Sequence, residues 1–257
     1  CSASAGRYIG VNKSNGENLL FIDGDMVLTN NWIKTALDLL DKNPSLAGVS
    51  PQINSDDYVN TEINGDIIER KNSYFSVQRL GGLGLYDRDL FLQSGGFDPD
   101  LPGYGDVDLG YRIKRSGFEL GVLSLVGCEH PKRPKTVNEL VRRWNAGHYV
   151  GMGMVLRKSI NDPVLLLKHI HRLKWTLAIP IHLLIALGSI WRGKQKMKIF
   201  VGISFVVYIY NIISYSTKDT IKSIVLAMTR TLGIVKSLRY STRNKQDYLE
   251  NIEVIQE

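Results

Sequence analysis

Apolar residues in the first half of the chain follow strand and helix patterns in turn. The run Leu19–Ile22 is short and bounded by polar residues, which predicts a buried strand of an α/β sheet. From Trp32 to Leu40 the apolar positions recur at helical spacing, with asparagine caps before them and Asn43-Pro44 as the stop. The run Ala47–Ser50 predicts a second strand.

The next regular pattern follows a polar stretch. Residues 54–76 are rich in Asn, Asp and Tyr, which predicts a variable loop or a small hairpin. Val107 to Ile113 has a helical pattern that ends at Ser116-Gly117, where glycine supplies a left-handed cap. Phe118–Val126 then alternates as a strand. Strands and helices in this order predict an α/β domain.

The second half of the chain carries two long uncharged segments. Trp175–Trp191 and Ile199–Thr217 contain no Lys, Arg, Asp or Glu, and each has close to the roughly 20 residues that cross a bilayer core. Tryptophans at both ends of the first segment and tyrosines late in the second fit interfacial belts. This pattern favours a hairpin of two transmembrane or re-entrant helices over the alternative, a pair of buried core helices.

We therefore divide the chain into four parts. Residues 1–150 form the α/β domain, and residues 151–174 form a basic linker or interfacial helix. The two apolar helices occupy 175–217, and 218–257 holds a basic amphipathic helix and a polar tail. That helix, from Ile221 to Val235, sets an apolar face against basic residues, which is typical of a helix that lies on anionic lipid. A helix that faces a protein partner is the alternative.

Composition and charge limit the kinds of binding partner that the chain is expected to have. The chain has 257 residues, is 44% hydrophobic and carries a net charge of +7, so it has enough apolar residues for a core. Basic residues concentrate after Lys132 beside the apolar segments, which favours an anionic membrane over nucleic acid. Cys1 and Cys128 lack the spacing of a disulfide framework or a zinc site. The basic flanks of the apolar hairpin are predicted to be cytoplasmic.

Two acidic motifs carry the candidate chemistry. Asp23 and Asp25 follow the first predicted strand and point the same way along an extended chain. Carboxylates so placed can hold Mg²⁺ or Mn²⁺ against a nucleotide diphosphate. The alternative is an Asp-Gly turn that caps the following helix.

The second motif places Asp106 just before a helix. A carboxylate there can act as a general base that takes a proton from an acceptor hydroxyl. The alternative is a plain helix cap. We assign catalysis to Asp106, and capping and an i,i+4 pair with Arg112 to Asp108.

Several motifs, in this order, resemble family 2 glycosyltransferases of the GT-A fold. They cover roughly residues 3 to 150 and are Ala5–Gly10, Phe21–Asp25, Gly95–Asp98 and Asp106–Arg112. The resemblance implies a Rossmann-like GT-A domain that lacks its first strands, because the chain opens just before the Asp-x-Asp strand. It also implies a nucleobase-binding region missing before Cys1 and, after the domain, C-terminal membrane-associated helices.

The resemblance also implies roles for particular residues. Asp23 and Asp25 would bind metal and the donor diphosphate, His130 would complete the metal site, and Asp106 would be the base. Gly82 lies in what resembles the acceptor-side glycine loop, and Asp108 stands beside the base.

A helix that begins at a Thr136–Glu139 capping box carries Arg143 and Trp144, which are similar to a pair that lies over the donor in processive members. The glutamine that precedes the pair in those members is absent, so processivity is not inferred. Gly105 departs from the family, which usually has Glu there.

These features predict an inverting transferase that depends on Mn²⁺ or Mg²⁺. The donor would be a UDP-, GDP- or dTDP-sugar, and the acceptor a cell-surface glycan or a lipid-linked molecule, at the cytoplasmic face of the cytoplasmic membrane. Two alternatives remain open. One is a catalytically inactive, membrane-anchored scaffold, and the other is a nucleotidyltransferase that uses the same aspartates.

Overall fold

The computed structural model describes residues 2–29, 32–54, 67–70, 74–130, 136–174, 176 and 220–253. The chain divides into two compact units. The first comprises Cys1–Glu139 with Ser241–Glu257, and the second comprises Leu140–Tyr240. This division falls after Glu139, whereas the sequence suggested residue 150. The predicted polar tail belongs to the first unit.

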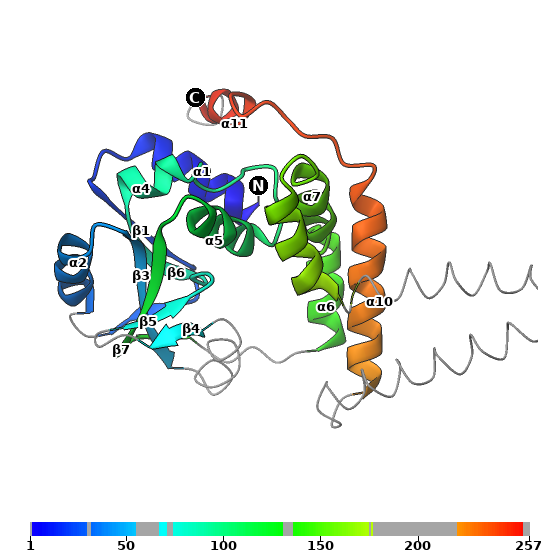
Figure 1. Ribbon diagram of the computed structural model, residues 1–257. Helices are drawn as coiled ribbons and strands as arrows, with labels where there is room; N and C mark the ends of the chain where they lie inside the picture. Colours follow the sequence, from blue (N-terminus) through cyan, green and yellow to red (C-terminus); the bar gives the residue numbers. More distant parts are fainter. Residues whose placement is uncertain are drawn as a thin grey trace, which may run out of the picture. The chain divides into compact units, whose positions relative to one another are not determined.

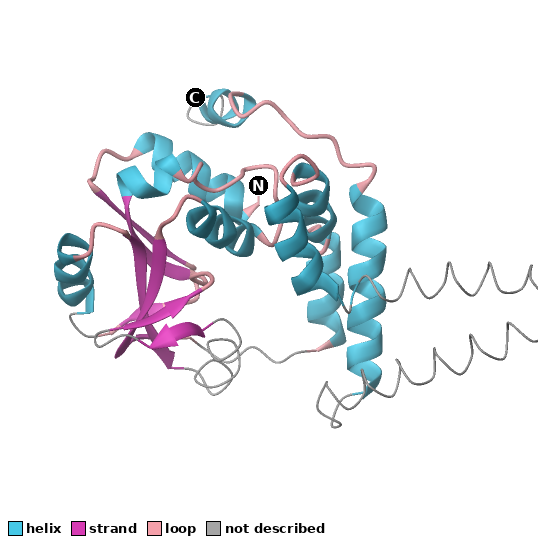
Figure 2. Ribbon diagram, in the orientation of Figure 1, coloured by secondary structure: helices cyan, strands magenta, loops and turns pink. Residues whose placement is uncertain are grey.

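The first unit is built on a sheet that has seven strands among the described residues. They are β1 Asn18–Ile22, β2 Val27–Leu28, β3 Leu46–Asn54, β4 Ile67–Arg70, β5 Tyr74–Val77, β6 Leu83–Asp87 and β7 Glu119–Glu129. The order is β1-β6-β3-β7-β5-β4, and β2 pairs with β7. Figures 1 and 2 show the sheet with helices packed against it. Strand β6 is antiparallel to β1 and β3, and β3 is parallel to β7. The carboxyl ends of β1, β3 and β7 therefore share one edge of the sheet.

Helices cover both faces of this sheet (Figure 1). Those of the first unit are α1 Ala3–Lys13, α2 Trp32–Lys42, α4 Arg88–Gln93, α5 Gly105–Arg115 and α11 Asp247–Glu253. On one face, Trp32 and Leu40 of α2 share a buried cluster with Val49. On the other face, Phe91 of α4 and Ile113 of α5 share a second cluster with the sheet. The predicted α/β class is confirmed as a three-layer arrangement.

The predicted C-terminal ends of two helices are confirmed, whereas the asparagines predicted to cap α2, Asn30 and Asn31, lie outside the described residues. Asn43 donates from Nδ2 to the Leu39 carbonyl at 2.7 Å, which closes α2. At the end of α5, Gly117 has a φ of 87°, and the Phe118 N–H bonds the Ile113 carbonyl at 3.1 Å. This left-handed cap is the one that glycine accommodates without a Cβ penalty.

Strand β1 differs from the prediction. It was expected to be buried, yet Leu20 and Ile22 are 40% and 41% exposed, and Leu19 is the buried apolar side chain. The reason is that, among the described residues, β1 pairs with β6 alone. Strands β3 and β7 extend beyond their predicted ends because they pair in parallel up to Asn54 and Glu129.

The predicted hairpin is confirmed in part. Strands β4 and β5 pair antiparallel within the polar stretch. The rest of that stretch, residues 55–66 and 71–73, lies outside the described residues.

The second unit is helical where it is described. Its helices are α6 Val137–Asn145, which begins before the division, α7 Val150–Lys158, residues 163–174 and α10 Thr220–Ser237. Helices α7 and α10 pack through small residues, since a Cβ on Gly153 would overlap Ser237 and one on Gly233 would overlap Tyr149. Arg157 closes α10 by donating to the carbonyls of Ser237 and Tyr240 at 3.1 and 2.6 Å.

A helix is confirmed over the stretch predicted to be amphipathic, as α10. Its small residues Gly233 and Ser237 pack against α7, whereas Leu232 and Val235 are more than half exposed. The two segments predicted to enter the membrane, 175–191 and 199–217, lie outside the described residues except for Thr176. Among the helices that are described, none combines the length and hydropathy needed to span a bilayer.

Candidate active site

The first acidic motif occupies the turn that leaves β1. The Met26 N–H bonds the Asp23 carbonyl at 3.0 Å, which folds the chain back toward β2. Strand β2 then pairs Val27 with Glu129, at the carboxyl end of β7. This pairing brings Asp25 beside His130, with 3.3 Å between Oδ2 and Nε2. Both side chains are about one-fifth exposed, at 23% and 17%.

Asp23 faces an arginine. Nη2 of Arg7 lies 2.5 Å from Oδ1 of Asp23, and the two side chains are 16% and 43% exposed. The guanidinium carbon of Arg7 also lies 4.9 Å from the centre of the Phe97 ring, a cation–π distance. Arg7 therefore connects helix α1 to the Asp-x-Asp turn and to the Gly-Gly-Phe-Asp segment.

Gly82 is required by the position of Asp23. The pairing of Ile22 with Leu83 sets Gly82 next to the Asp23 turn. A Cβ on Gly82 would overlap the Asp23 carboxylate and the Met26 methyl. The Asp23 side chain therefore fills the space beside Gly82.

The three predicted metal ligands do not converge on one point. Asp25 faces His130, and Asp23 faces Arg7. Across the described residues no group of three or more His, Cys, Asp or Glu side chains is placed to hold a metal. Asp25 and His130 nevertheless fit a cation such as Mn²⁺, because a carboxylate oxygen and an imidazole nitrogen are both ligands of such ions.

The second acidic motif lies in the first turn of α5. Tyr104, with a φ of 71°, is the N-cap residue and makes no side-chain capping bond. Asp106 forms an ion pair with Arg79, and their side chains are 26% and 13% exposed. A Cβ on Gly110 would overlap the Gln78 carbonyl and Arg79, so α5 lies close against this segment and sets Arg79 beside Asp106.

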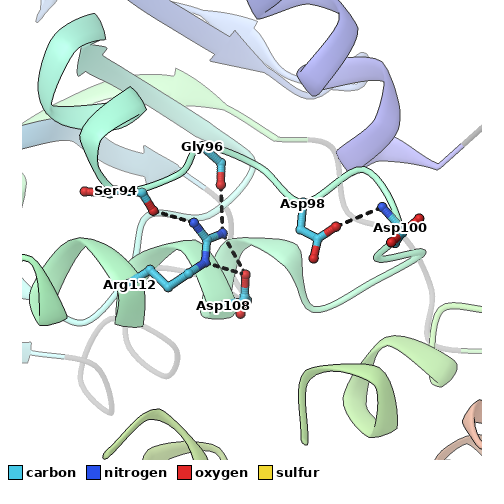
Figure 3. Close-up of polar contacts among 6 residues, drawn as sticks. All are labelled: Ser94, Gly96, Asp98, Asp100, Asp108 and Arg112. Carbon is cyan, nitrogen blue, oxygen red and sulfur yellow. Dashed lines mark hydrogen bonds and ion pairs between the residues drawn. The ribbon is translucent and has the colours of Figure 1, made fainter. Parts of the chain in front are cut away.

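Asp108 does not cap the helix, contrary to the prediction. Its carboxylate accepts two bonds from Arg112, at 2.9 Å from Nε and 2.7 Å from Nη2, which confirms the predicted pair. Arg112 also donates to the carbonyls of Ser94 and Gly96 at 2.6 and 2.7 Å (Figure 3). Capping by Asp108 is excluded because Tyr104 already occupies the cap position.

The Gly-Gly-Phe-Asp segment is held against α5 by these bonds. Gly95 and Gly96 have φ values of 84° and 60°, a backbone region that side chains with a Cβ rarely adopt. Arg112 ties the carbonyls of Ser94 and Gly96 to the helix, and Asp98 accepts a bond from the Asp100 N–H at 3.1 Å (Figure 3). The segment is thus a support for the helix that carries Asp106.

One buried tyrosine connects the two acidic motifs. Tyr86 on β6 is 3% exposed, and burial raises the pKa of its hydroxyl well above the ordinary value. The Asp106 carboxylate also raises this pKa, while Arg7 and Arg79 lower it. Arg7, Arg79 and Asp106 therefore act on the same buried residue. Helix α1 also contacts both motifs, since its Arg7 pairs with Asp23 and its Ser4 lies against Gly105, the neighbour of Asp106.

The structure also explains why residue 105 is a glycine. A Cβ at this position would overlap the Ser4 hydroxyl, and Ser4 is buried on α1. The volume next to the base is therefore occupied by a serine from another helix. The glutamate that the family resemblance leads one to expect has no room there unless Ser4 moves.

Arg143 and Trp144 lie on α6 in the second unit. The Lys236 ammonium of α10 is 5.2 Å from the centre of the Trp144 ring, so this ring forms part of the contact between the two helices. The Thr136 hydroxyl accepts a bond from the Glu139 N–H at 3.3 Å, which confirms the predicted cap of α6.

Sequence comparison finds no relative: no family model matches the chain, and no curated protein matches it. Solved structures do match. The mannosyltransferase PcManGT from Pyrobaculum calidifontis, in complex with GDP-Man and Mn²⁺, aligns with a TM-score of 0.55 and 18% identity over 93% of this chain and 67% of that one.

Two weaker likenesses cover less of their proteins. GalNAc-T7 with UDP, GalNAc and Mn²⁺ aligns at 18% identity and a TM-score of 0.42, over 52% of this chain and 31% of that one. TarS from S. aureus in complex with UDP-GlcNAc aligns at 15% identity and a TM-score of 0.39, over 63% and 51%. This chain thus spans less than a third of the GalNAc-T7 chain and about half of the TarS chain, which comprises residues 1–349. The likeness to PcManGT defines the fold as that of a glycosyltransferase.

Proposed function

We propose that this chain is an inverting, metal-dependent glycosyltransferase of family 2. It would move a sugar from a UDP-, GDP- or dTDP-sugar to a cell-surface glycan or a lipid-linked acceptor. The observation that supports this most is that helix α1 contacts both acidic motifs within one unit of the fold: Arg7 pairs with Asp23 of the Asp23–Asp25 turn, and Ser4 lies against Gly105, the neighbour of Asp106.

Asp106 would be the general base. Its carboxylate takes the proton of the acceptor hydroxyl while the hydroxyl oxygen attacks the anomeric carbon of the donor sugar. The bond from that carbon to the diphosphate oxygen breaks, and its electron pair leaves with the nucleotide. Arg79 pairs with Asp106 and thereby fixes the position of the carboxylate that accepts the proton.

Asp25 and His130 would hold the divalent cation, and Asp23 would complete the donor site. A Mn²⁺ or Mg²⁺ ion supplies charge neutralisation for the leaving diphosphate. Arg7 contacts Asp23 in the structure and offers a second positive charge at the same turn. These residues bind and orient the donor, and Asp106 does the proton chemistry.

The products separate this function from a nucleotidyltransferase. With Mn²⁺ and a UDP-, GDP- or dTDP-sugar, the proposed enzyme releases a nucleoside diphosphate. With nucleoside triphosphates and sugar phosphates, a nucleotidyltransferase releases pyrophosphate. Pyrophosphate as the product, without nucleotide release from any sugar nucleotide, would overturn the proposal.

The proposed location is the cytoplasmic face of the cytoplasmic membrane. Residues 163–174 form a helix whose inner side buries His169 and Leu173. Its outer side continues an apolar stripe at helical spacing: Ile160, Val164, Leu167 and Ile170 are 67%, 43%, 65% and 38% exposed. Lys168, Arg172 and Lys174 lie on the same stretch. Exposed apolar residues with basic neighbours are typical of a helix that lies on anionic lipid.

A spin label at position 167 tests this location. In vesicles that contain anionic lipid, a label on Leu167→Cys is expected to collide more with oxygen, which concentrates in lipid, than with a water-soluble nickel chelate. The matched control is Asp89→Cys, an exposed position on α4 of the first unit, which should favour the chelate. Both labels would be placed in a Cys1→Ser background. Equal access of the chelate to both positions would contradict the membrane-facing assignment.

A further inference from the structure

The loop that precedes the base-bearing helix is held at several points. Residues 98–104 connect the Gly-Gly-Phe-Asp segment to α5. Leu101 is fully buried within this loop, and its N–H bonds the Asp98 carbonyl at 3.2 Å. The Ser2 hydroxyl donates to the Pro99 carbonyl at 3.4 Å. The conformation of this loop decides where the first turn of α5, and therefore Asp106, begins.

The C-terminal segment also contacts this loop. The Tyr248 hydroxyl donates to Oδ1 of Asp100 at 2.9 Å, and the Arg243 N–H donates to the same oxygen at 3.1 Å. Helix α11, which contains Tyr248, also lies against α1 (Figure 1). Tyr248 and Asp100 are 148 residues apart in sequence, so this contact closes a long loop of the chain.

The Tyr248–Asp100 bond is charge-assisted. Burial and the bond to Asp100 raise the pKa of the Tyr248 hydroxyl to about 12. The hydroxyl is therefore protonated at neutral pH and donates a hydrogen bond to the Asp100 carboxylate. Hydrogen bonds to a charged group contribute more than neutral ones.

We propose that Tyr248 and Asp100 are positioning residues: the segment 241–253 clasps the loop 98–104 and thereby fixes the first turn of α5, which carries Asp106. The catalytic consequence rests on the proposed transferase function. The clasp itself is a structural statement that can be tested without it.

The test compares four variants of the full chain in detergent. Tyr248→Phe removes the hydroxyl alone, and Asp100→Ala removes the acceptor of both bonds. Asp100→Asn keeps an amide oxygen that accepts from both donors, so it serves as the conservative rescue. Tyr240→Phe is the matched control, because it removes a tyrosine hydroxyl that has no part in the clasp.

The first readout is hydrogen exchange of the amides in residues 98–104. Loss of one charge-assisted bond predicts about tenfold faster exchange in Tyr248→Phe. Asp100→Ala should exchange at least as fast, Asp100→Asn should fall between Asp100→Ala and the parent because it keeps the acceptor without the charge, and Tyr240→Phe should match the parent. The double variant Tyr248→Phe with Asp100→Ala should equal Asp100→Ala alone, since Asp100→Ala already removes the acceptor of the Tyr248 bond. Unchanged exchange in Tyr248→Phe and Asp100→Ala would overturn the clasp.

The second readout is nucleotide release. A displaced base predicts that Tyr248→Phe lowers kcat about fivefold while the donor KM stays the same. Faster exchange with an unchanged kcat would overturn the positioning role. If the parent releases nucleotide from no donor, the proposed function fails, and the exchange measurement still decides whether the clasp exists.

Discussion

Replacing Asp106 by asparagine is expected to lower the rate of nucleotide release by roughly 10²–10⁴-fold, the range that general-base catalysis contributes. An amide has the shape of the carboxylate and can still accept a bond from Arg79, so the fold should remain intact. It cannot take a proton from an acceptor hydroxyl. Steady-state kinetics with saturating donor would measure the loss in kcat.

Two control variants separate the base from its supports. Asp89→Asn makes the same change at an exposed position on α4 and should leave kcat unchanged. Asp108→Asn weakens the bonds to Arg112 and should lower the thermal stability of the protein. Full activity in Asp106→Asn, or an equal loss in Asp89→Asn, would show that Asp106 is not the base.

Removing the Asp25 carboxylate is expected to have the second largest effect. In Asp25→Asn one charged ligand beside His130 is lost, so a higher Mn²⁺ concentration should be needed for half-maximal activity. The rate at fixed low Mn²⁺ should fall by about a hundredfold, because the metal stabilises the charge that develops in the transition state by several kcal/mol. A Mn²⁺ titration of parent and variant measures both quantities.

The same titration can contradict the assignment. His130→Ala should shift the Mn²⁺ requirement in the same direction, because its Nε2 lies 3.3 Å from the Asp25 carboxylate. Asp38→Asn, an exposed carboxylate on α2, is the control that should shift nothing. If Asp25→Asn and the parent required equal Mn²⁺, Asp25 would not be a ligand.

Local patterns predicted the elements that hold the site. The strand before Asp23, helix α5 and the left-handed cap at Gly117 all follow from residue spacing and turn chemistry, which depend on near neighbours in sequence. The pair of Asp108 with Arg112 follows in the same way, since residues four apart face each other on a helix.

The partners of the two acidic motifs depend on tertiary contacts. Arg7 lies inside the Ala5–Gly10 motif, and nothing in that motif indicates that its guanidinium reaches Asp23. No sequence pattern near Arg79 indicated that it pairs with Asp106, because this pairing depends on how closely α5 packs at Gly110. The contact of the polar tail with Asp100 could not be predicted from the sequence either, since the two segments are more than 140 residues apart.

Errors in the predictions have the same origin. The cap of α5 was assigned to an aspartate by residue preference, but Tyr104 holds that position in a left-handed conformation. Strand β1 was predicted to be buried from its apolar residues, but burial depends on what lies against the strand. The sequence showed that glycine replaces the expected glutamate at position 105 but gave no reason for it. The reason is a tertiary contact, because Ser4 occupies the space beside Gly105.

The most direct test of the central claim is nucleotide release by the unmodified chain in detergent, with a panel of UDP-, GDP- and dTDP-sugars. Each donor would be measured with Mn²⁺ and again after chelation by EDTA. The proposed function predicts release of the nucleotide from at least one donor, with loss of activity in EDTA and recovery when Mn²⁺ is restored. No release from any donor by the folded protein, or release that EDTA leaves unchanged, would contradict a metal-dependent glycosyltransferase.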